Sequence, residues 1–111
     1  MAERSDEFSI DRQGALIRDV VPARGEAYRH RCTLAAFEAV AHAIDEAGGA
    51  GVTLEVIAAR EDLPSTQVAV ALALLKERGI VTVEGRRSYP ASGCVHLDAM
   101  IEYHALREQA T

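Results

Sequence analysis

The chain has 111 residues, of which 49% are apolar and 26% charged, with a formal net charge of −5 at pH 7. This length suits one domain, and the composition excludes wholesale disorder. No apolar run approaches the roughly 20 residues of a membrane span, and the first residues lack a signal sequence, so we expect a cytoplasmic protein with no membrane partner.

The first 31 residues predict an N-terminal arm or a loose hairpin. Strand-forming residues occur at 8–10 and 16–21, and the turn-prone segment 11–14 separates them. A small basic cluster follows, consisting of Arg24, Arg29, His30 and Arg31. We expect this cluster to be a solvated charged linker, although it would extend a basic surface if it folded beside the later hairpin.

The pattern of residues 33–47 predicts the first helix. Thr33 is a suitable N-cap, and Gly48 can end the helix because glycine accepts left-handed dihedral angles without strain. Apolar residues recur at the three- and four-residue spacing of one buried face, at Leu34, Phe37, Val40, Ala41 and Ile44.

Two shorter helices are expected next. Thr53 can cap the first of them, and Pro64 prevents it from continuing into the second. Ser65 or Thr66 is the expected cap of the later helix, which Gly79 ends. Its inward side is predicted to consist of Val68, Ala71, Leu72 and Leu75.

The remaining elements are a hairpin and a last helix. Residues 80–84 and 88–89 have strand character around a turn at 85–87, and Pro90 ends the ladder. Residues 95–109 carry apolar side chains on more than one face. We expect one face to pack on the first helix and another to pack on a second copy in a homodimer.

The order of these elements over residues 33–90 resembles the winged helix-turn-helix superfamily. Ala58 is the small residue where two helices approach, and Val68 is the branched residue that locks the third helix onto the second. Asp62 falls at the turn where family members often have glycine, and Asp tolerates left-handed dihedral angles better than most residues.

The resemblance implies a mainly α fold with a small β-hairpin wing, in which a three-helix core is followed by a C-terminal helix. The expected organisation is an N-terminal arm or hairpin over 1–31 and a winged-helix domain over 32–92. The C-terminal helix over 93–111 would pack on that domain or on a dimer partner.

The resemblance also implies a DNA-binding, transcription-associated regulator. In that family the third helix enters the major groove and the wing contacts the backbone or the minor groove. Of the side chains expected to face outward, Thr66 and Gln67 can hydrogen-bond to DNA, and Arg86 and Arg87 at the wing tip can contact phosphates. Duplex DNA is the partner on this interpretation.

A protein interaction or dimerisation module is the alternative. Residues 52–92 carry five positive and five negative charges, so they attract phosphates weakly. Val70, Ala73 and Leu74 are expected to face outward as an apolar strip, which is typical of a protein interface. An N- or C-terminal segment folding over this strip would instead make it part of the core.

Neither a metal site nor an enzyme is expected. His30 and Cys32, with Cys94 and His96, form two mirrored pairs whose spacing fits no common zinc module. The two cysteines are expected to be buried thiols. No phosphate-binding loop or nucleophile elbow occurs, so we expect no catalysis and no cofactor.

Overall fold

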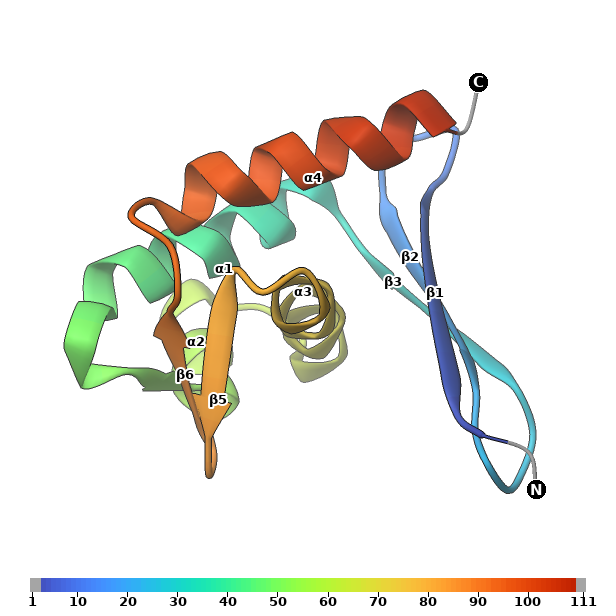
Figure 1. The fold of residues 1–111 in the computed structure, drawn as a ribbon, viewed down its shortest axis with the longest axis horizontal. Helices are drawn as coiled ribbons and strands as arrows, with labels where there is room; N and C mark the ends of the chain where they lie inside the picture. Colours follow the sequence, from blue (N-terminus) through green and yellow to red (C-terminus); the bar gives the residue numbers. More distant parts are fainter. Residues whose placement is uncertain (1–2, 110–111) are drawn as a thin grey trace.

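The computed structural model describes residues 3–109, and within them the chain forms four α-helices and two small antiparallel sheets of three strands each (Figure 1). Helix α4 lies along α1, and α3 lies between the two sheets. One apolar core connects all these layers. It includes Ile10, Leu16 and Cys32 from the first sheet together with Phe37 and Leu75 from the helices.

The first sheet consists of β1 (Ser5–Ile10), β2 (Leu16–Val21) and β3 (Tyr28–Cys32), in that order. The predicted hairpin is therefore present as β1 and β2. The prediction of a solvated linker is wrong for β3, which pairs along its whole length with β2. Strand pairing and the burial of Cys32 against the helices outweigh the charged character of this segment.

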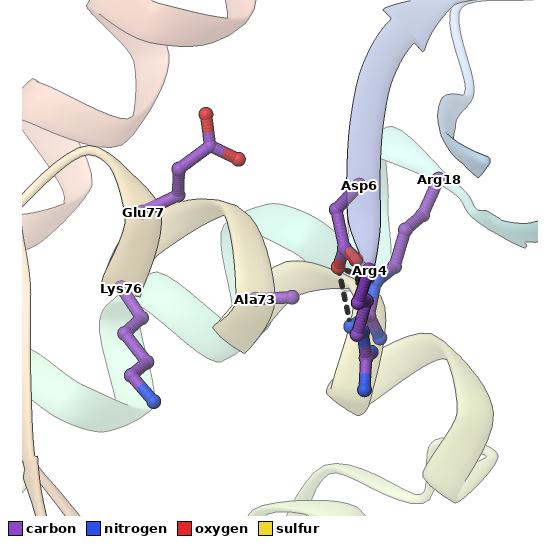
Figure 2. A pocket seen from close by; sticks show the side chains of 6 residues that line it. All are labelled: Arg4, Asp6, Arg18, Ala73, Lys76 and Glu77. Carbon is purple, nitrogen blue, oxygen red and sulfur yellow. Dashed lines mark hydrogen bonds and ion pairs between the residues drawn. The ribbon is translucent and has the colours of Figure 1, made fainter. Parts of the chain in front are cut away.

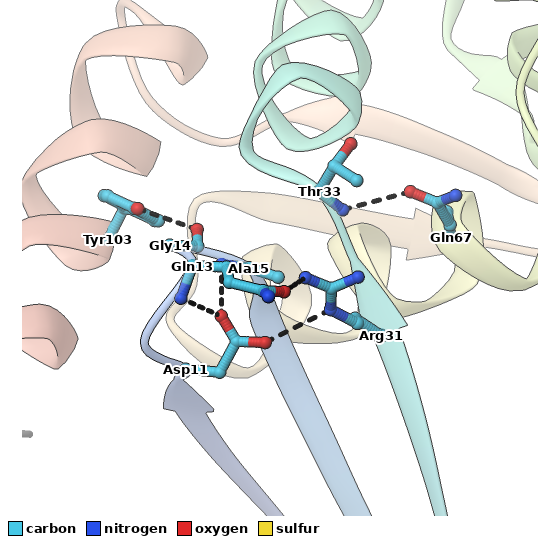
Figure 3. A network of polar contacts seen from close by, with 8 residues as sticks. All are labelled: Asp11, Gln13, Gly14, Ala15, Arg31, Thr33, Gln67 and Tyr103. Carbon is cyan, nitrogen blue, oxygen red and sulfur yellow. Dashed lines mark hydrogen bonds and ion pairs between the residues drawn. The ribbon is translucent and has the colours of Figure 1, made fainter.

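A polar network holds the turn between β1 and β2 against β3 and α4 (Figure 3). The Asp11 carboxylate accepts hydrogen bonds of 2.9 Å from the backbone N–H groups of Gln13 and Ala15. The Arg31 guanidinium donates to Asp11 Oδ2 at 3.1 Å and to Gln13 Oε1 at 2.6 Å. Side-chain bonds to local backbone groups fix such a turn, so the end of the sheet next to α4 has a defined position.

Helix α1 (Leu34–Ala47) confirms the predicted first helix. The Thr33 hydroxyl accepts a hydrogen bond from the Ala36 N–H, which satisfies one of the free donors of the first turn. Gly48 ends the helix with a φ of 53°, a left-handed value that glycine adopts without strain. Phe37, Val40 and Ile44 are fully buried on its inner face.

Helix α2 (Leu54–Glu61) also begins and ends as predicted. Thr53 caps it by accepting a hydrogen bond from the Val56 N–H, and Asp62 follows with left-handed dihedral angles of 53° and 52°. A short 3-10 turn, Gly48–Ala50, and strand β4 (Val52–Thr53) precede it. Strand β4 carries no signal in the sequence, because two residues are too few to show a strand pattern.

Helix α3 (Ser65–Glu77) follows Pro64, whose carbonyl accepts hydrogen bonds from the N–H groups of Gln67 and Val68. The prediction that Ser65 or Thr66 caps this helix is wrong, since Pro64 occupies the cap position and no side chain bonds there. A trans proline has a fixed φ near the helical value and loses no hydrogen bond at this point.

The predicted outward strip on α3 is also wrong for Val70 and Leu74, which have 0% exposure. Strand β3 packs against α3 on one side while α1 and α2 pack on others, so the buried face is wider than one helical stripe. The alternative prediction, that a terminal segment folds over the strip and makes it part of the core, is confirmed for the N-terminal segment, which packs on α3 as β3. Ala73 is half-buried, and Leu72, which was expected inside, is half-buried as well.

The second sheet has the order β4-β6-β5, with β5 (Val81–Glu84) and β6 (Arg87–Pro90) forming the predicted hairpin. Its turn has two residues, Gly85 and Arg86, because Glu84 already pairs with Arg87. The predicted three-residue turn is therefore one residue too long.

Helix α4 (Val95–Gln109) confirms the predicted last helix and packs on α1. The Asp45 carboxylate accepts hydrogen bonds from the N–H groups of Val95 and His96, at 2.8 and 2.9 Å, and so caps α4 from the neighbouring helix. Leu97 and Ile101 on its outer face are 58% and 57% exposed.

Candidate binding groove

The solvent side of α3 is a stripe of mostly small or apolar residues. It consists of Ser65, Ala69, Leu72, Ala73 and Lys76, whose spacing of three or four residues places them on one helical face. Ala69, Leu72 and Ala73 are half-buried, while Ser65 and Lys76 are exposed. The stripe therefore has an apolar centre between polar ends.

Two hollows lie side by side over Ala73 and Lys76 and share Arg18 as a lining residue, so we treat them as one groove. The first, of about 450 Å³, is lined by Arg4, Asp6, Arg18, Ala73, Lys76 and Glu77 (Figure 2). The second, of about 310 Å³, is lined by Arg18, Leu54, Ala69, Leu72, Ala73, Lys76, Val83, Arg86 and Ser88. We call the joined surface the α3 groove. The first sheet forms one wall, the hairpin of β5 and β6 forms the other, and α3 forms the floor.

The wall formed by the first sheet carries a charged triplet. Figure 2 shows Arg4, Asp6 and Arg18 together, opposite Ala73 on α3. Arg18 Nη2 lies 2.6 Å and Arg4 Nε lies 3.1 Å from the Asp6 carboxylate oxygens. Partial burial raises the pKa of Asp6, but hydrogen bonds and charge from Arg18 and Arg4 outweigh it and hold the pKa below its ordinary value. Asp6 is therefore ionised at neutral pH, and its charge offsets one of the two arginines.

The other cations of the groove are free to meet a ligand. Lys76 and Arg86 are exposed, and neither forms an ion pair within residues 3–109. Glu77, at one end, lies 3.5 Å from Arg78. The groove thus contains four cations and two anions on a chain whose total charge is −5. It favours an anionic ligand although the whole chain is acidic.

The structure separates the four residues predicted to bind nucleic acid. Arg86 lines the groove. Thr66 is exposed in the first turn of α3 and lines neither hollow described above. Gln67 Oε1 accepts a hydrogen bond of 3.0 Å from the Thr33 N–H (Figure 3), so its carbonyl is used to join α3 to α1.

Arg87 turns away from the groove toward the start of β4. Its Nη1 lies 3.3 Å from the Ala50 carbonyl oxygen and 3.5 Å from that of Gly51, and it donates to both. Gly51 in turn lies under the Tyr89 ring, where an added Cβ would come within 2.5 Å of the ring. Arg87 therefore helps to hold this part of the second sheet in place.

Several residues of the groove were not found by sequence reasoning. Helical spacing alone places Lys76 on the same face as Ala69 and Ala73, so the sequence would predict Lys76 once this face is known to point to solvent. Arg18 carries no such signal, since only the packing of the first sheet brings it beside α3. The same is true of Val83, which is 40% exposed on β5.

The histidine and cysteine residues lie elsewhere. Cys32 is buried, which raises the pKa of its thiol to about 12, and Cys94 is exposed. The prediction of two buried thiols is thus wrong for Cys94, which lies just before α4. His96 Nε2 lies 3.0 Å from Glu38 Oε1, and the His96 ring stacks on that of His42 with centroids 3.9 Å apart. In the part of the chain that the structure describes, no group of three such side chains could hold a metal ion.

Comparison of the chain with models of protein families, with curated proteins and with solved structures gave no match. Among the helices of residues 3–109, none combines the length and the apolar character that crossing a bilayer requires. The geometry and charge of the α3 groove are therefore the basis for a functional proposal.

Proposed function

We propose that the protein is a winged helix-turn-helix protein whose α3 groove binds a segment of another protein. The winged-helix assignment is supported by the order of α1, β4, α2, α3, β5 and β6 and by the pairing of β4 with β6. It is supported further by the left-handed Asp62 at the turn between α2 and α3.

A single observation carries the proposed binding role: the solvent side of α3 is apolar and lies in a groove with cations along its sides. Ala69, Leu72 and Ala73 offer no hydrogen-bonding group to a base edge, whereas apolar side chains of a partner can displace water from them. Lys76 and Arg86 would attract acidic side chains beside the apolar contact. The fitting ligand is a protein segment with both apolar and acidic residues.

The energies are consistent with a modest affinity. Burial of about 150 to 300 Å² of apolar surface contributes about 4 to 8 kcal/mol at about 25 cal/mol per Å². Lost freedom of motion and the ordering of side chains offset part of this gain, so a short segment bound here would reach micromolar rather than nanomolar affinity.

DNA binding in transcription regulation is the second candidate, and two observations favour it. Thr66 is exposed in the first turn of α3, and of the free cations Lys76 lies on the same helix and Arg86 lines the groove beside it. In this role the protein would contact phosphates and make few hydrogen bonds to base edges, because the centre of the stripe is apolar and Gln67 is bonded to Thr33. Its affinity would fall steeply with added salt.

We propose self-association through α4 as a companion of either role. Leu97 and Ile101 lie four residues apart on the outer face of α4, and both are more than half exposed. A second copy would bury this pair. Sedimentation across a wide concentration range, with Leu97→Lys as the comparison, tests it: a wild-type protein that stays monomeric contradicts the proposal.

A photocrosslinking residue placed at position 73 tests the binding role directly in cells that make the full chain. Position 59, an exposed alanine on α2, is the matched control. We expect protein adducts at position 73 and few at position 59, and the crosslinked peptide, identified by mass spectrometry, should contain acidic and apolar residues. Lys76→Glu combined with Arg86→Glu should remove the adducts.

The other outcomes of this experiment decide between the candidates. Nucleic-acid adducts at position 73, together with salt-sensitive binding of a random duplex in an anisotropy titration, would favour DNA. Equal adducts at positions 73 and 59 would contradict a binding role for the α3 groove.

A further inference from the structure

Two alanines lie at the centre of the solvent-facing side of α3. Ala69, Leu72, Ala73 and Lys76 follow the spacing i, i+3, i+4 and i+7, and the two alanines leave little side-chain bulk at its centre. Helices pack at axial distances of about 8 to 10 Å according to the side chains at the contact, and small residues allow the shorter distances. The floor of the groove can therefore take a second helix at close range.

The length of the groove also suits a helix. Its floor follows α3 from Ala69 to Glu77, which at about 1.5 Å per residue corresponds to about 12 Å, or two turns. A helix docked in a groove presents anchors at i, i+3, i+4 and i+7, which cover about the same length. Arg18 on one side and Val83 with Arg86 on the other would flank such a helix.

An extended segment that added to the edge of β5 would find few main-chain partners. Strand β5 is at the edge of its sheet, but it has only four residues. Its residues after Val81 are exposed, but four residues offer few main-chain groups for pairing with a new strand. Main-chain pairing is the main source of affinity in strand addition, and this edge offers little of it.

We infer that the partner segment bound in the α3 groove is an amphipathic α-helix with acidic residues along the borders of its apolar face. This inference rests on the proposed protein-binding function and specifies the form of the ligand. Small apolar side chains of the incoming helix cover Ala69 and Ala73. Glu or Asp side chains on its borders lie near Lys76 and Arg86, and a basic helix is repelled.

The test is selection of random 16-residue peptides displayed on phage against the full chain. Two variants serve for counter-selection: Ala73→Glu places a charge on the floor, and Lys76→Glu with Arg86→Glu reverses the free cations. Lys76 and Arg86 are exposed, so the second variant is expected to fold even if the first does not. Enriched peptides are then synthesised and titrated, each beside a version with a central proline.

We expect enriched peptides with apolar residues at helical spacing and acidic residues on their flanks. Each variant should weaken their binding at least about tenfold, and the central proline should do the same, since it breaks a helix. Proline-tolerant peptides whose apolar residues alternate would overturn the helical form while leaving protein binding in place. If no peptide distinguished wild type from either variant, both the helical form and the proposed function would fail.

Discussion

The Tyr103 hydroxyl donates a hydrogen bond of 2.8 Å to the carbonyl oxygen of Gly14, across 89 positions of the chain (Figure 3). Tyr103 is only 1% exposed, and its ring also packs near Phe37. This contact joins the last helix to the first turn of the first sheet. It shows that the N-terminal strands and α4 support each other around the helical core.

Tyr103→Phe should destabilise the protein by about 0.5 to 1.5 kcal/mol, because the Gly14 carbonyl loses its partner while the ring is retained. Urea unfolding followed by circular dichroism measures this change. Tyr28→Phe is the matched control, because Tyr28 is 39% exposed. The free energy of unfolding of this variant should lie within about 0.5 kcal/mol of the wild-type value. Equal effects of the two substitutions would show that the bond to Gly14 contributes nothing.

Leu74→Ala should cost about 2 to 5 kcal/mol, because Leu74 is fully buried where β3 and α1 pack on α3. Leu97→Ala is the control for the same chemical change on an exposed helix face and should cost less than about 1 kcal/mol. Urea unfolding of the two variants makes the comparison. A loss at Leu74 as small as that at Leu97 would contradict the burial of Leu74 and would favour the exposed apolar strip predicted from the sequence.

The left-handed conformation of Asp62 predicts opposite effects for two small substitutions. Its φ is 53°, the one positive φ of a non-glycine residue in the described part of the chain. Asp62→Gly should leave the stability unchanged or raise it slightly, whereas Asp62→Ala should lower it by about 1 to 2 kcal/mol. Thermal unfolding of the three proteins ranks them, and alanine ranking above glycine would argue against the observed turn.

Ionised Asp11 stabilises the fold, and this contribution should be lost in acid. The hydrogen bond from the Ala15 N–H lowers the pKa of Asp11, whereas partial burial raises it. The Gln13 N–H and Arg31 lower it further, so the pKa stays below its ordinary value of 3.8. A carboxyl group whose folded pKa is lowered contributes stability above its unfolded pKa, and this stability is lost as the pH falls through the folded pKa.

Asp11→Asn keeps an oxygen acceptor for the turn but cannot ionise. The stability advantage of wild type over this variant should be largest near neutral pH and should shrink as the pH falls below about 4. Urea unfolding at a series of pH values measures the difference. A constant difference across that range would mean that ionised Asp11 does not stabilise the fold.

The two cysteines should react at very different rates. Cys94 is exposed, whereas Cys32 has 0% exposure and burial raises its pKa to about 12, so its thiolate is scarce. Iodoacetamide should add one group to the native protein and two to the denatured protein, as measured by intact mass. Cys94→Ser should take no group while folded, and native modification at Cys32 would contradict its burial.

Local sequence signals predicted the helices and most of their ends, the start of α3 excepted. Thr33 and Thr53 each bond to a nearby N–H, and Gly48 and Asp62 adopt left-handed angles, so these boundaries depend on residues close in the chain. The pairing of β1 with β2 and that of β5 with β6 also depend on nearby residues, because in each case a turn separates two segments of strand-forming residues.

The sequence by itself determined which segments become helices, because caps, turn residues and apolar spacing act over a few positions. Only the tertiary structure decided which way α3 faces. Val70 and Leu74 become core because β3, a segment of charged residues far back in the chain, packs on α3 together with α1 and α2, so that more than one stripe of the helix is buried. The same packing brings Arg18 beside Ala73 and Lys76, so the α3 groove arises from contacts between distant segments that no local pattern encodes.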